Sequence, residues 1–313
     1  MKKSYLFTAF IAFVIGLSFS SCSKNDNNPS TPPVVDDGRI NPSSIATADL
    51  IAYWGFEGTP KDSIGQRGVA TSAVTYPTGR RGSAFQGGDG AYISFDLPTS
   101  DKLATLKTFT IAMWLKTPNL ANASGIPCFF QLSGEGWQGS FAVYQDNLGD
   151  NTADSLMMKA YFGKQGVNWA GQWVAQSDPS ITADKWFHFV LNYDNTTSTA
   201  TMYINGGAYK VVTTSAYGLT TRYQDDPGDV DNPNGAATLG DLNLELRAKD
   251  PTNPTSDDKG IIGYWANRAF YGDMSNDWQG TFNGMIDELR VYDRALTDSE
   301  VKALYDAEVT QIN

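Results

Sequence analysis

The sequence is poor in cysteine and histidine. Its 313 residues include two cysteines, Cys22 and Cys128, and a single histidine, His188. His188 lies in the strand-like run WFHFVLNYD without an accompanying Ser or Cys pattern, so we expect a packed strand residue and not a catalytic base. An isolated thiol such as Cys128 is most often a small buried residue.

Positive charge is also scarce. The chain has 23 Lys and Arg residues against 34 Asp and Glu residues, which gives a formal net charge of −11. If Lys2 and Lys3 are removed with an N-terminal signal, 21 basic side chains face 34 acidic ones and the charge becomes −13. An acidic chain without a basic stripe argues against nucleic acid or a polyanionic polysaccharide as the main partner.

Common catalytic motifs are missing. No HExxH, GxSxG or phosphate-loop pattern occurs anywhere in the chain. These patterns carry the zinc ligands, the nucleophilic serine and the phosphate cradle of large enzyme classes. Their absence disfavours those enzymes.

The N-terminus carries a targeting segment. Lys2 and Lys3 precede an apolar run from Tyr5 to Leu17, which is shorter than the roughly 20 residues that span a bilayer. Small residues then lead to Cys22. Residues 1–22 resemble a bacterial lipoprotein signal in which Cys22 is lipidated; an ordinary secretory signal is the alternative.

Residues 23–47 are rich in Asn, Ser, Pro and Asp and hold too few apolar groups to fold. We expect a flexible tether between the lipid anchor and the rest of the chain, with no other membrane contact. The SKND sequence after Cys22 resembles the export tags of surface lipoproteins in Bacteroidetes. This resemblance implies a lipid-anchored protein of the outer membrane, on the cell surface or the periplasmic face.

Residues 48–313 are long enough for one large domain with a full core. The runs DLIAYWGFEG, FTIAMWLKTP, Trp186–Asp194 and ATMYINGG alternate apolar and polar residues, and the last ends in an Asn-Gly hairpin signal. Short strands separated by turn residues, with one clear helix, predict an all-β fold made of two antiparallel sheets packed as a sandwich.

The stretch from Gly280 to Tyr305 predicts a strand, a turn and a helix. Strict alternation from Met285 to Tyr292 would place Asp287 on the same face as the apolar Leu289 and Val291. A carboxylate there costs several kcal/mol unless a cation or hydrogen-bond donors meet it, so Asp287 needs a partner.

A short C-terminal helix through Tyr305 should follow. Thr297 and Glu300 have capping-box spacing, and Leu296 and Val301 have the spacing of a hydrophobic staple.

The sequence of this stretch, FNGMIDELRVYDRALTDSEVKALY, resembles the C-terminal signature of laminin-G-like, concanavalin A-like lectin/glucanase jelly-roll domains. The opening DLIAYWGFEG and the turn KDSIGQRG are similar to the start of the same family. The resemblance implies a structural calcium held by Glu57 and Asp287, since Ca²⁺ takes six to eight oxygen ligands. The alternative is that Asp287 caps local backbone amides or pairs with an arginine.

A second acidic cluster lacks the Gly and terminal Glu spacing of an EF-hand loop, so we expect a solvated loop there. Its members are Asp225, Asp226, Asp229 and Asp231.

Two stretches exceed what the resemblance covers, residues 119–185 and 213–276, and we expect them to be insertions. They hold four of the eight tryptophans, Trp137, Trp169, Trp173 and Trp265, and a fifth, Trp278, lies two residues after the second stretch. Sugars present apolar C–H faces with a polar rim, and aromatic rings beside amide or acidic side chains suit them. We therefore expect these tryptophans to include the contacts to an oligosaccharide or polysaccharide, although several could fill satellite cores under the insertions.

Two other functions stay open. A protein-binding adhesion module would use the same sandwich. A glycoside hydrolase would need two carboxylates on one strand face, and no Glu-x-Asp-x-Glu run is present. The nearest pairs, Asp241 with Glu245 and Asp287 with Glu288, lie in an apparent loop or point to opposite faces. Carboxylates from separate strands would escape this test, so the sequence leans against an enzyme without excluding one.

Overall fold

The computed structural model describes thirteen stretches of the chain, all within one compact unit, Pro32–Asn313. They are residues 42–67, 69–98, 100–118, 125–132, 141–146, 156–162, 172–174, 181–196, 199–212, 214–215, 218–219, 259–271 and 278–309. The predicted signal, Cys22, most of the tether and the acidic cluster at 225–231 lie outside them. Within the described residues, no helix is long and apolar enough to cross a membrane.

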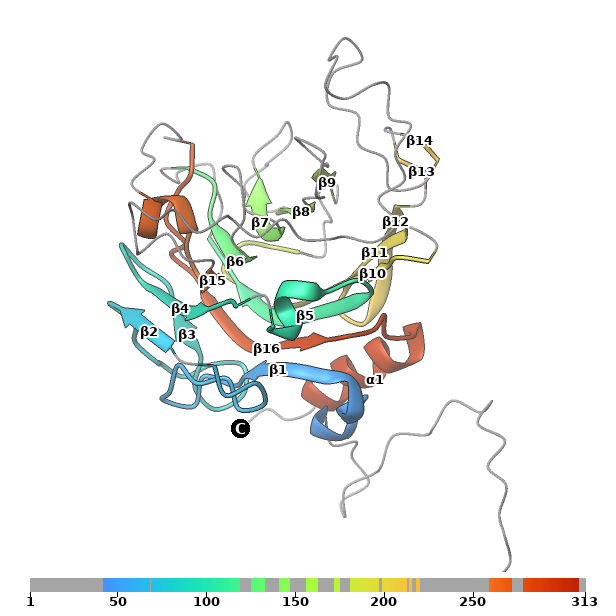
Figure 1. Cartoon of the computed structure of the whole chain (residues 1–313), viewed down its shortest axis with the longest axis horizontal. Coiled ribbons are helices and arrows are strands. Elements are labelled where there is room, and N and C mark those ends of the chain that lie inside the picture. Colours follow the sequence, from blue (N-terminus) through green and yellow to red (C-terminus); the bar gives the residue numbers. More distant parts are fainter. Residues whose placement is uncertain are drawn as a thin grey trace, which may run out of the picture. The chain divides into compact units, whose positions relative to one another are not determined.

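The first sheet contains the strand predicted near the C-terminus, with antiparallel neighbours throughout (Figure 1). Across the sheet the order is β1 (Leu50–Trp54), β16 (Met285–Tyr292), β5 (Phe109–Lys116), β10 (Phe187–Asp194), β11 (Thr199–Ile204) and β12 (Gly207–Val212), with β3 (Phe85–Gln86) also paired to β16. The Asn-Gly signal forms the turn between β11 and β12, because Asn205 and Gly206 both have positive φ, 51° and 79°.

The second sheet is antiparallel as well. Its order is β2 (Val69–Ser72), β4 (Tyr92–Asp96), β15 (Lys259–Ile262), β6 (Cys128–Leu132), β7 (Phe141–Asp146), β8 (Met157–Phe162) and β9 (Gln172–Val174). A separate two-stranded ladder joins β13 (Thr214–Ser215) to β14 (Gly218–Leu219).

Helical segments are short. Those in the described residues are the 3-10 turns Pro42–Ser44, Thr47–Asp49 and Lys102–Thr105, the π-helical turn Asn267–Tyr271, and the α-helix α1 (Asp298–Val309). The prediction of an all-β, two-sheet antiparallel sandwich with a C-terminal helix is therefore confirmed.

The main core fills the space between the two sheets. Trp54 from the first sheet is fully buried, and its ring centroid lies 5.3 Å from that of Phe95 and 6.3 Å from that of Phe130, both on the second sheet. Such aromatic pairs add about 0.5–1.5 kcal/mol to the burial of their area. Cys128 and His188 are buried strand residues, as expected.

The expected alternation along β16 is wrong at its first half. A bulge interrupts the pairing with β5 between Asp287 and Arg290, and Glu288 there has a φ of +53°. One extra residue on one strand moves the preceding side chains to the opposite face. Ile286 therefore joins Leu289 and Val291 in the core, and Asp287 does not share their face.

The helix α1 covers the face of the first sheet that points away from the second. Its start has the predicted capping box: Thr297 N donates to Glu300 Oε2 at 2.8 Å, and Glu300 N donates to Thr297 Oγ1 at 3.2 Å. Leu296 and Val301 are buried together in the apolar cluster beneath the helix. The helix continues to Val309, beyond the predicted end at Tyr305.

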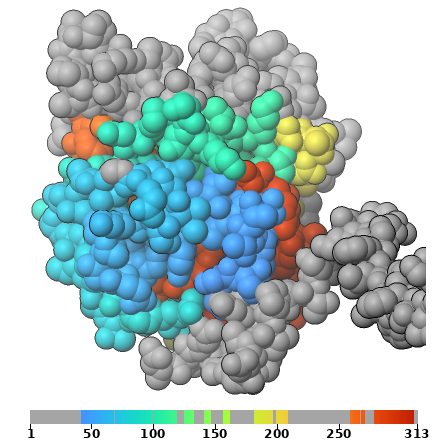
Figure 2. All heavy atoms as spheres, turned by 60° about the horizontal axis from the view of Figure 1, so that its bottom comes forward, coloured from blue at the N-terminus to red at the C-terminus, as the bar shows by residue number. Residues whose placement is uncertain are grey.

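The start of the domain lies against its end. β1 pairs with β16, and the turn Pro42–Ser44 contacts α1. Figure 2 shows the surface on this side, where the blue residues from 42 onward lie directly beside red residues of the C-terminal part.

Candidate functional site

The two tryptophan-rich stretches meet in one sheet. Residues 119–185 supply β6 to β9, and residues 213–276 supply β15, which lies between β4 and β6. In the register, Ile261 is opposite Gln131 and Ile262 is opposite Phe130. The described parts of both predicted insertions therefore include sheet scaffold, and they lie side by side.

Side chains of the second sheet divide between two faces. On β7, Phe141 and Val143 belong to the core between the sheets, whereas Ala142 and Tyr144 belong to a separate cluster. We call the face away from the core the outer face of the second sheet. Of the five predicted sugar-contact tryptophans, Trp265 and Trp278 are described on this face.

An aromatic cluster occupies part of this outer face. Its members are Cys128, Ala142, Tyr144, Tyr161 and Trp265, with Ile126 and Trp278 packed against them. The ring centroid of Trp265 lies 5.5 Å from that of Tyr144 and 5.2 Å from that of Trp278, and the two indole planes are at 78°. We call this group the Trp265 cluster.

A second aromatic group lies nearby on the same face. Tyr264 stacks on Tyr92 with 6.0 Å between ring centroids, and Phe270 meets Tyr92 edge-on at 5.6 Å. Arg268 lies over the Tyr264 ring, 5.5 Å from its centroid. The outer face thus carries two aromatic groups joined by the segment 263–271.

Buried polar groups anchor this segment to the sheet. Gln131 is fully buried, and its side-chain oxygen accepts a hydrogen bond from Ala266 N at 2.7 Å. The Trp265 Nε1–H donates to the Ile126 carbonyl oxygen at 2.7 Å. The π-helical turn Asn267–Tyr271 begins directly after these contacts, and such turns occur often at functional sites.

Two ion pairs are described on the outer face, besides Arg268 over the Tyr264 ring. Lys159 on β8 and Asp146 on β7 form an ion pair whose side chains are 1% and 5% exposed. Near the other side of the sheet, Lys259 pairs with Asp96, which is largely exposed. No cluster of three or more His, Cys, Asp and Glu side chains able to hold a metal occurs in the described part of the chain.

The predicted sugar-contact tryptophans have different locations. Trp265 is fully buried and belongs to a satellite core, which is the alternative that the sequence left open. Trp278 is half-buried against the Trp265 cluster. Trp173 is in β9, opposite Ala160 in the register, and its side chain is outside the described parts, as are Trp137 and Trp169 entirely.

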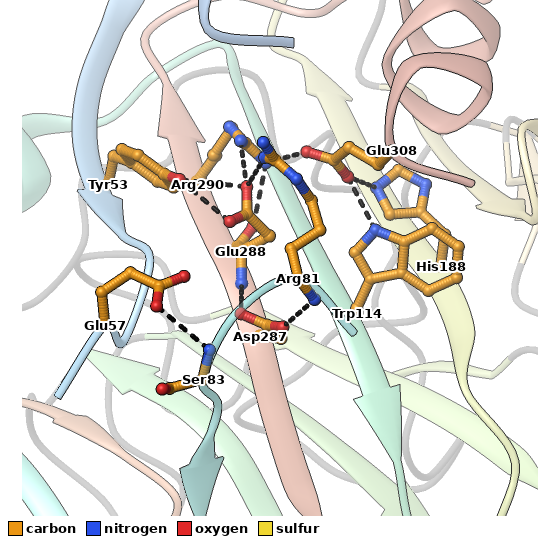
Figure 3. Close-up of polar contacts among 10 residues, drawn as sticks. All are labelled: Tyr53, Glu57, Arg81, Ser83, Trp114, His188, Asp287, Glu288, Arg290 and Glu308. Atoms are coloured by element: carbon orange, nitrogen blue, oxygen red, sulfur yellow. Dashed lines mark hydrogen bonds and ion pairs between the residues drawn. The ribbon is translucent and has the colours of Figure 1, made fainter. Parts of the chain in front are cut away.

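The two predicted calcium ligands reach the same turn, residues 79–83 (Figure 3). Asp287 Oδ2 accepts a hydrogen bond from Arg81 N at 2.8 Å, and the exposed Glu57 accepts one from Ser83 N at 3.1 Å. Asp287 Oδ1 also accepts from Glu288 N at 2.8 Å. Burial raises the pKa of Asp287 to about 8, and the negative charge of Glu288 also acts in this direction.

Asp287 therefore finds its partners in backbone amides, the alternative to calcium. Two carboxylates are fewer than the six to eight oxygens that Ca²⁺ takes, so further ligands would have to come from carbonyl groups. Calcium at Glu57 and Asp287 stays a prediction.

A chain of buried charges on the first sheet was not foreseen from the sequence (Figure 3). Arg81 donates to Glu288 at 2.8 Å, Glu288 pairs with Arg290, and Arg290 pairs with Glu308 in the last turn of α1. Trp114 Nε1–H also donates to Glu308, at 2.7 Å. Two arginines and two glutamates alternate, so the chain is neutral when all four are ionised.

Burial and neighbouring charges shift the pKa values of the residues in this group. Burial alone would raise the pKa of Glu288, but Arg290 and Arg81 outweigh it and hold that pKa below its usual value. Burial raises the pKa of Glu308 to about 7. Burial and the charge of Arg290 lower the pKa of His188 to about 3, so this histidine is neutral. No sequence signal marks Glu308 as buried.

Comparison with known proteins identifies the fold. Residues 87–229 match a laminin G-type family model described as the concanavalin A-like lectin/glucanases superfamily. A search of curated proteins found no match.

Among solved structures, the chain is similar to domain 4 of AbnA, an extracellular arabinanase from Geobacillus stearothermophilus, in complex with arabinotriose. The identity is 18% and the TM-score 0.49, over 82% of this chain and 98% of that chain. It is also similar to the binding domain of botulinum neurotoxin DC, determined with rat synaptotagmin II (11% identity, TM-score 0.51, 84% and 52% of the two chains) and with SialylT (12%, 0.52, 83% and 52%). The chain thus spans about half the length of the toxin binding domains. At these identities the likeness to the toxin binding domains shows a shared fold.

Proposed function

Because the chain contains a concanavalin A-like lectin/glucanase-type domain, we propose that it is a cell-envelope lipoprotein that binds an oligosaccharide or polysaccharide without cleaving it. Cys22 carries the lipid, residues 23–47 form the tether, and the protein is anchored in the outer membrane on the cell surface or the periplasmic face. The sugar lies over the outer face of the second sheet.

One observation carries this proposal. The two tryptophan-rich stretches, which are far apart in the sequence, converge on one face because β15 pairs with β6. There, Trp265 from the second stretch packs against Tyr144 from the first, and Trp278, just after the second stretch, packs against Trp265. Aromatic side chains that gather from two distant segments line many ligand sites, and this supports a site on the outer face.

The side chains on this face suit an uncharged ligand. Sugar rings need aromatic surfaces for their C–H faces and polar groups for their hydroxyls. Tyr92 and Trp278, both half-buried, supply aromatic surface on this face. Trp137, Trp169 and Trp173 each stand beside an amide residue in the sequence, and their side chains lie outside the described part of the chain. The ion pair between Lys159 and Asp146 is self-neutralised, and the guanidinium of Arg268 is engaged by the Gln279 carbonyl oxygen and the Tyr264 ring.

The described strands disfavour hydrolysis. Their acidic side chains on the second sheet are Asp96 on β4 and Asp146 on β7, and two strands, β15 and β6, lie between. Three strand spacings amount to about 14 Å. Glycoside hydrolases hold their two carboxyl groups roughly 5–9.5 Å apart, so this pair is too widely separated for that reaction.

A protein partner is the second candidate. The binding domain of botulinum neurotoxin DC shares this fold and was determined with both a protein and SialylT. Because a fold hosts many functions, the choice depends on what the outer face accepts. Adhesion to a protein becomes the first candidate if no sugar binds.

The experiment is a glycan-array and affinity-gel screen of the full chain carrying Cys22→Ser, with calcium and with EDTA, while released reducing sugar is measured. Binding without released sugar is the expected result. Release of reducing sugar would overturn the noncatalytic function, and the absence of any binding would overturn the glycan function.

A further inference from the structure

The last residues of the predicted tether pack on the domain, where Figure 1 shows them in dark blue beside α1. Pro42 is buried in a 3-10 turn that contacts α1, and Ile45 is 2% exposed. The Ile45 side chain belongs to the apolar cluster beneath α1, together with Leu296 and Val301. Residues 42–49 therefore form a docked segment that precedes β1. We call it the N-terminal strap.

Polar contacts fix the end of the strap. Asp293 N donates to the Asp49 carbonyl oxygen at 2.9 Å, and Arg294 Nε donates to Asp49 Oδ2 at 2.6 Å. The same guanidinium donates to both carboxylate oxygens of Glu300 in the first turn of α1, at 2.8 and 2.6 Å. Bidentate contacts of this kind are strong and fix the geometry of both partners. Arg294 thus links the strap to the start of α1.

β1 alone is poorly placed to bear tension. It stands at the edge of the first sheet and has five residues. Its pairing with β16 is irregular between Leu50 and Ala52, the end at which the chain enters. Because the hydrogen bonds of an antiparallel pair lie across the strands, a strand pulled away at one end loses them one at a time. Irregular pairing at that end makes the first loss easier.

The strap offers a second path for tension. Force from the tether reaches the buried Ile45 and then Asp49, and these residues act on α1 and on the end of β16. The helix is itself fastened to the first sheet by Leu304 in the same apolar cluster and by the buried pair of Glu308 with Arg290. The force is thereby spread over several contacts before it reaches β1.

We propose that the N-terminal strap is a load-bearing device that carries tension from a membrane anchor past β1 into α1 and β16. A domain that is anchored at its start and bound to a large glycan on the opposite side is pulled whenever the two move apart. This inference rests on the lipid-anchored function proposed above, because the anchor at Cys22 is what pulls on the strap.

The test applies tension directly with optical tweezers, so its outcome does not depend on lipid or sugar. One handle is attached to Cys22 of the unlipidated full chain and the other to Asp96→Cys, because Asp96 is largely exposed on the second sheet and Cys128 is buried. At constant force, Ile45→Ala and Asp49→Ala should each shorten the lifetime of the folded state by about tenfold or more, which corresponds to about 1.4 kcal/mol in the barrier.

Ile64→Ala and Asp89→Ala are the matched controls. Ile64 is 44% exposed, Asp89 is exposed, and neither belongs to the strap. The lifetimes of both variants should equal that of the unchanged protein. Ile45→Ala should also add an early lengthening step, as residues 42–54 leave the sheet and extend at about 3.4 Å a residue.

A second pulling direction separates load bearing from simple support of the fold. In a Cys22→Ser chain, handles on Asp96→Cys and Lys185→Cys pull the second sheet against the start of β10, and the tension does not pass through the strap. Lys185 is exposed. In this direction Ile45→Ala and Asp49→Ala should change the lifetime much less than in the first direction.

The outcomes decide between the two roles. Lifetimes that stay unchanged in Ile45→Ala and Asp49→Ala, with force applied through Cys22, would overturn the strap as a load-bearing device. Equal shortening in both directions would overturn it as well, because the residues would then only support the fold. Failure of lipidation or of glycan binding is measured separately and would overturn the proposed function without changing these lifetimes.

Discussion

Arg290 on β16 and Glu308 in the last turn of α1 form an ion pair whose side chains are 1% and 0% exposed. The pair fastens the C-terminal helix to the first sheet. Arg80 reinforces this contact, because its guanidinium donates to the Val309 carbonyl oxygen at 2.8 Å and lies 4.7 Å from the Trp114 ring centroid. Buried charges of this kind depend on every partner being present.

Removal of Arg290 should strongly destabilise the domain. Arg290→Ala leaves Glu288 and Glu308 without the cation between them, and breaking a buried pair costs about 3–5 kcal/mol. The free energy of unfolding in urea is the measurement. Lys302→Ala is the control, because Lys302 and Asp306 form an exposed i,i+4 pair worth only about 0.3–0.5 kcal/mol. An equal loss of unfolding free energy in Arg290→Ala and Lys302→Ala would contradict a large contribution from the buried pair of Arg290 and Glu308.

Stability should depend on the protonation of Glu308. Burial raises its pKa from 4.5 to about 7, so the folded protein binds a proton in a pH range where the unfolded chain does not. This contribution is complete below about pH 4.5 and is lost as the pH rises through 7. Asp287, with a pKa of about 8, acts in the same direction.

Glu308→Gln should therefore flatten the decline in unfolding free energy between pH 6 and 8, by about 1–3 kcal/mol over the interval. Urea midpoints at pH 5, 6, 7 and 8 provide the test. Asp298→Asn, at the other end of α1, serves as the control. If the unfolding free energy of Glu308→Gln declined as steeply with pH as that of the unchanged protein, a group other than Glu308 would cause the pH dependence.

The sequence predicts the sandwich well because local patterns determine it. β5 and β10 alternate regularly, Asn205-Gly206 fixes a hairpin, and Thr297 with Glu300 marks the start of the helix. These features depend on neighbours within a few residues. The bulge at Glu288 was missed because it leaves no mark in an otherwise alternating run.

The site was predictable only in part. The sequence marked the two tryptophan-rich stretches, but not that β15 brings them together, because strand pairing over such a distance has no local signal. For the same reason it could not separate the buried Trp265 from the half-buried Trp278. The burial of Glu308 likewise depends on where α1 docks.

The capping box at the start of α1 should contribute about 1 kcal/mol to the free energy of unfolding. Thr297→Ala removes the oxygen that accepts the Glu300 N–H, and N-cap replacements by alanine cost about that much. Thr297→Ser keeps the oxygen and is the matched control. The melting temperature should fall for the alanine variant alone; an equal fall for both would attribute the effect to the lost methyl group.

Calcium binding can be tested by thermal unfolding. If Ca²⁺ binds near Glu57 and Asp287, millimolar calcium should raise the melting temperature above its value in EDTA, because a ligand of the folded state stabilises it. Asp287→Asn should remove this difference, whereas Asp89→Asn, in a different turn, should keep it. An identical melting temperature with calcium and with EDTA would favour the backbone amides as the sole partners of Asp287.

Lipidation should depend on Cys22. We expect the full chain to partition with membranes and to incorporate labelled palmitate in a bacterial host, and Cys22→Ser to lose both properties. Cys128→Ser is the control, because Cys128 is fully buried. Membrane association that survives Cys22→Ser would point to uncleaved apolar signal residues, and incorporation of label by Cys22→Ser would contradict the lipoprotein assignment.

The position of β15 sets the order in which the protein can mature. β4 and β6 are made early in the chain, but the strand that joins them arrives only at Lys259–Ile262. Until then both strands have unsatisfied edges, which are prone to pair with other chains. A polypeptide that leaves the ribosome or an export channel from its N-terminus must therefore postpone closure of this sheet until late in its passage. Any chain that stops before residue 259 would release an aggregation-prone fragment instead of a partly working binder.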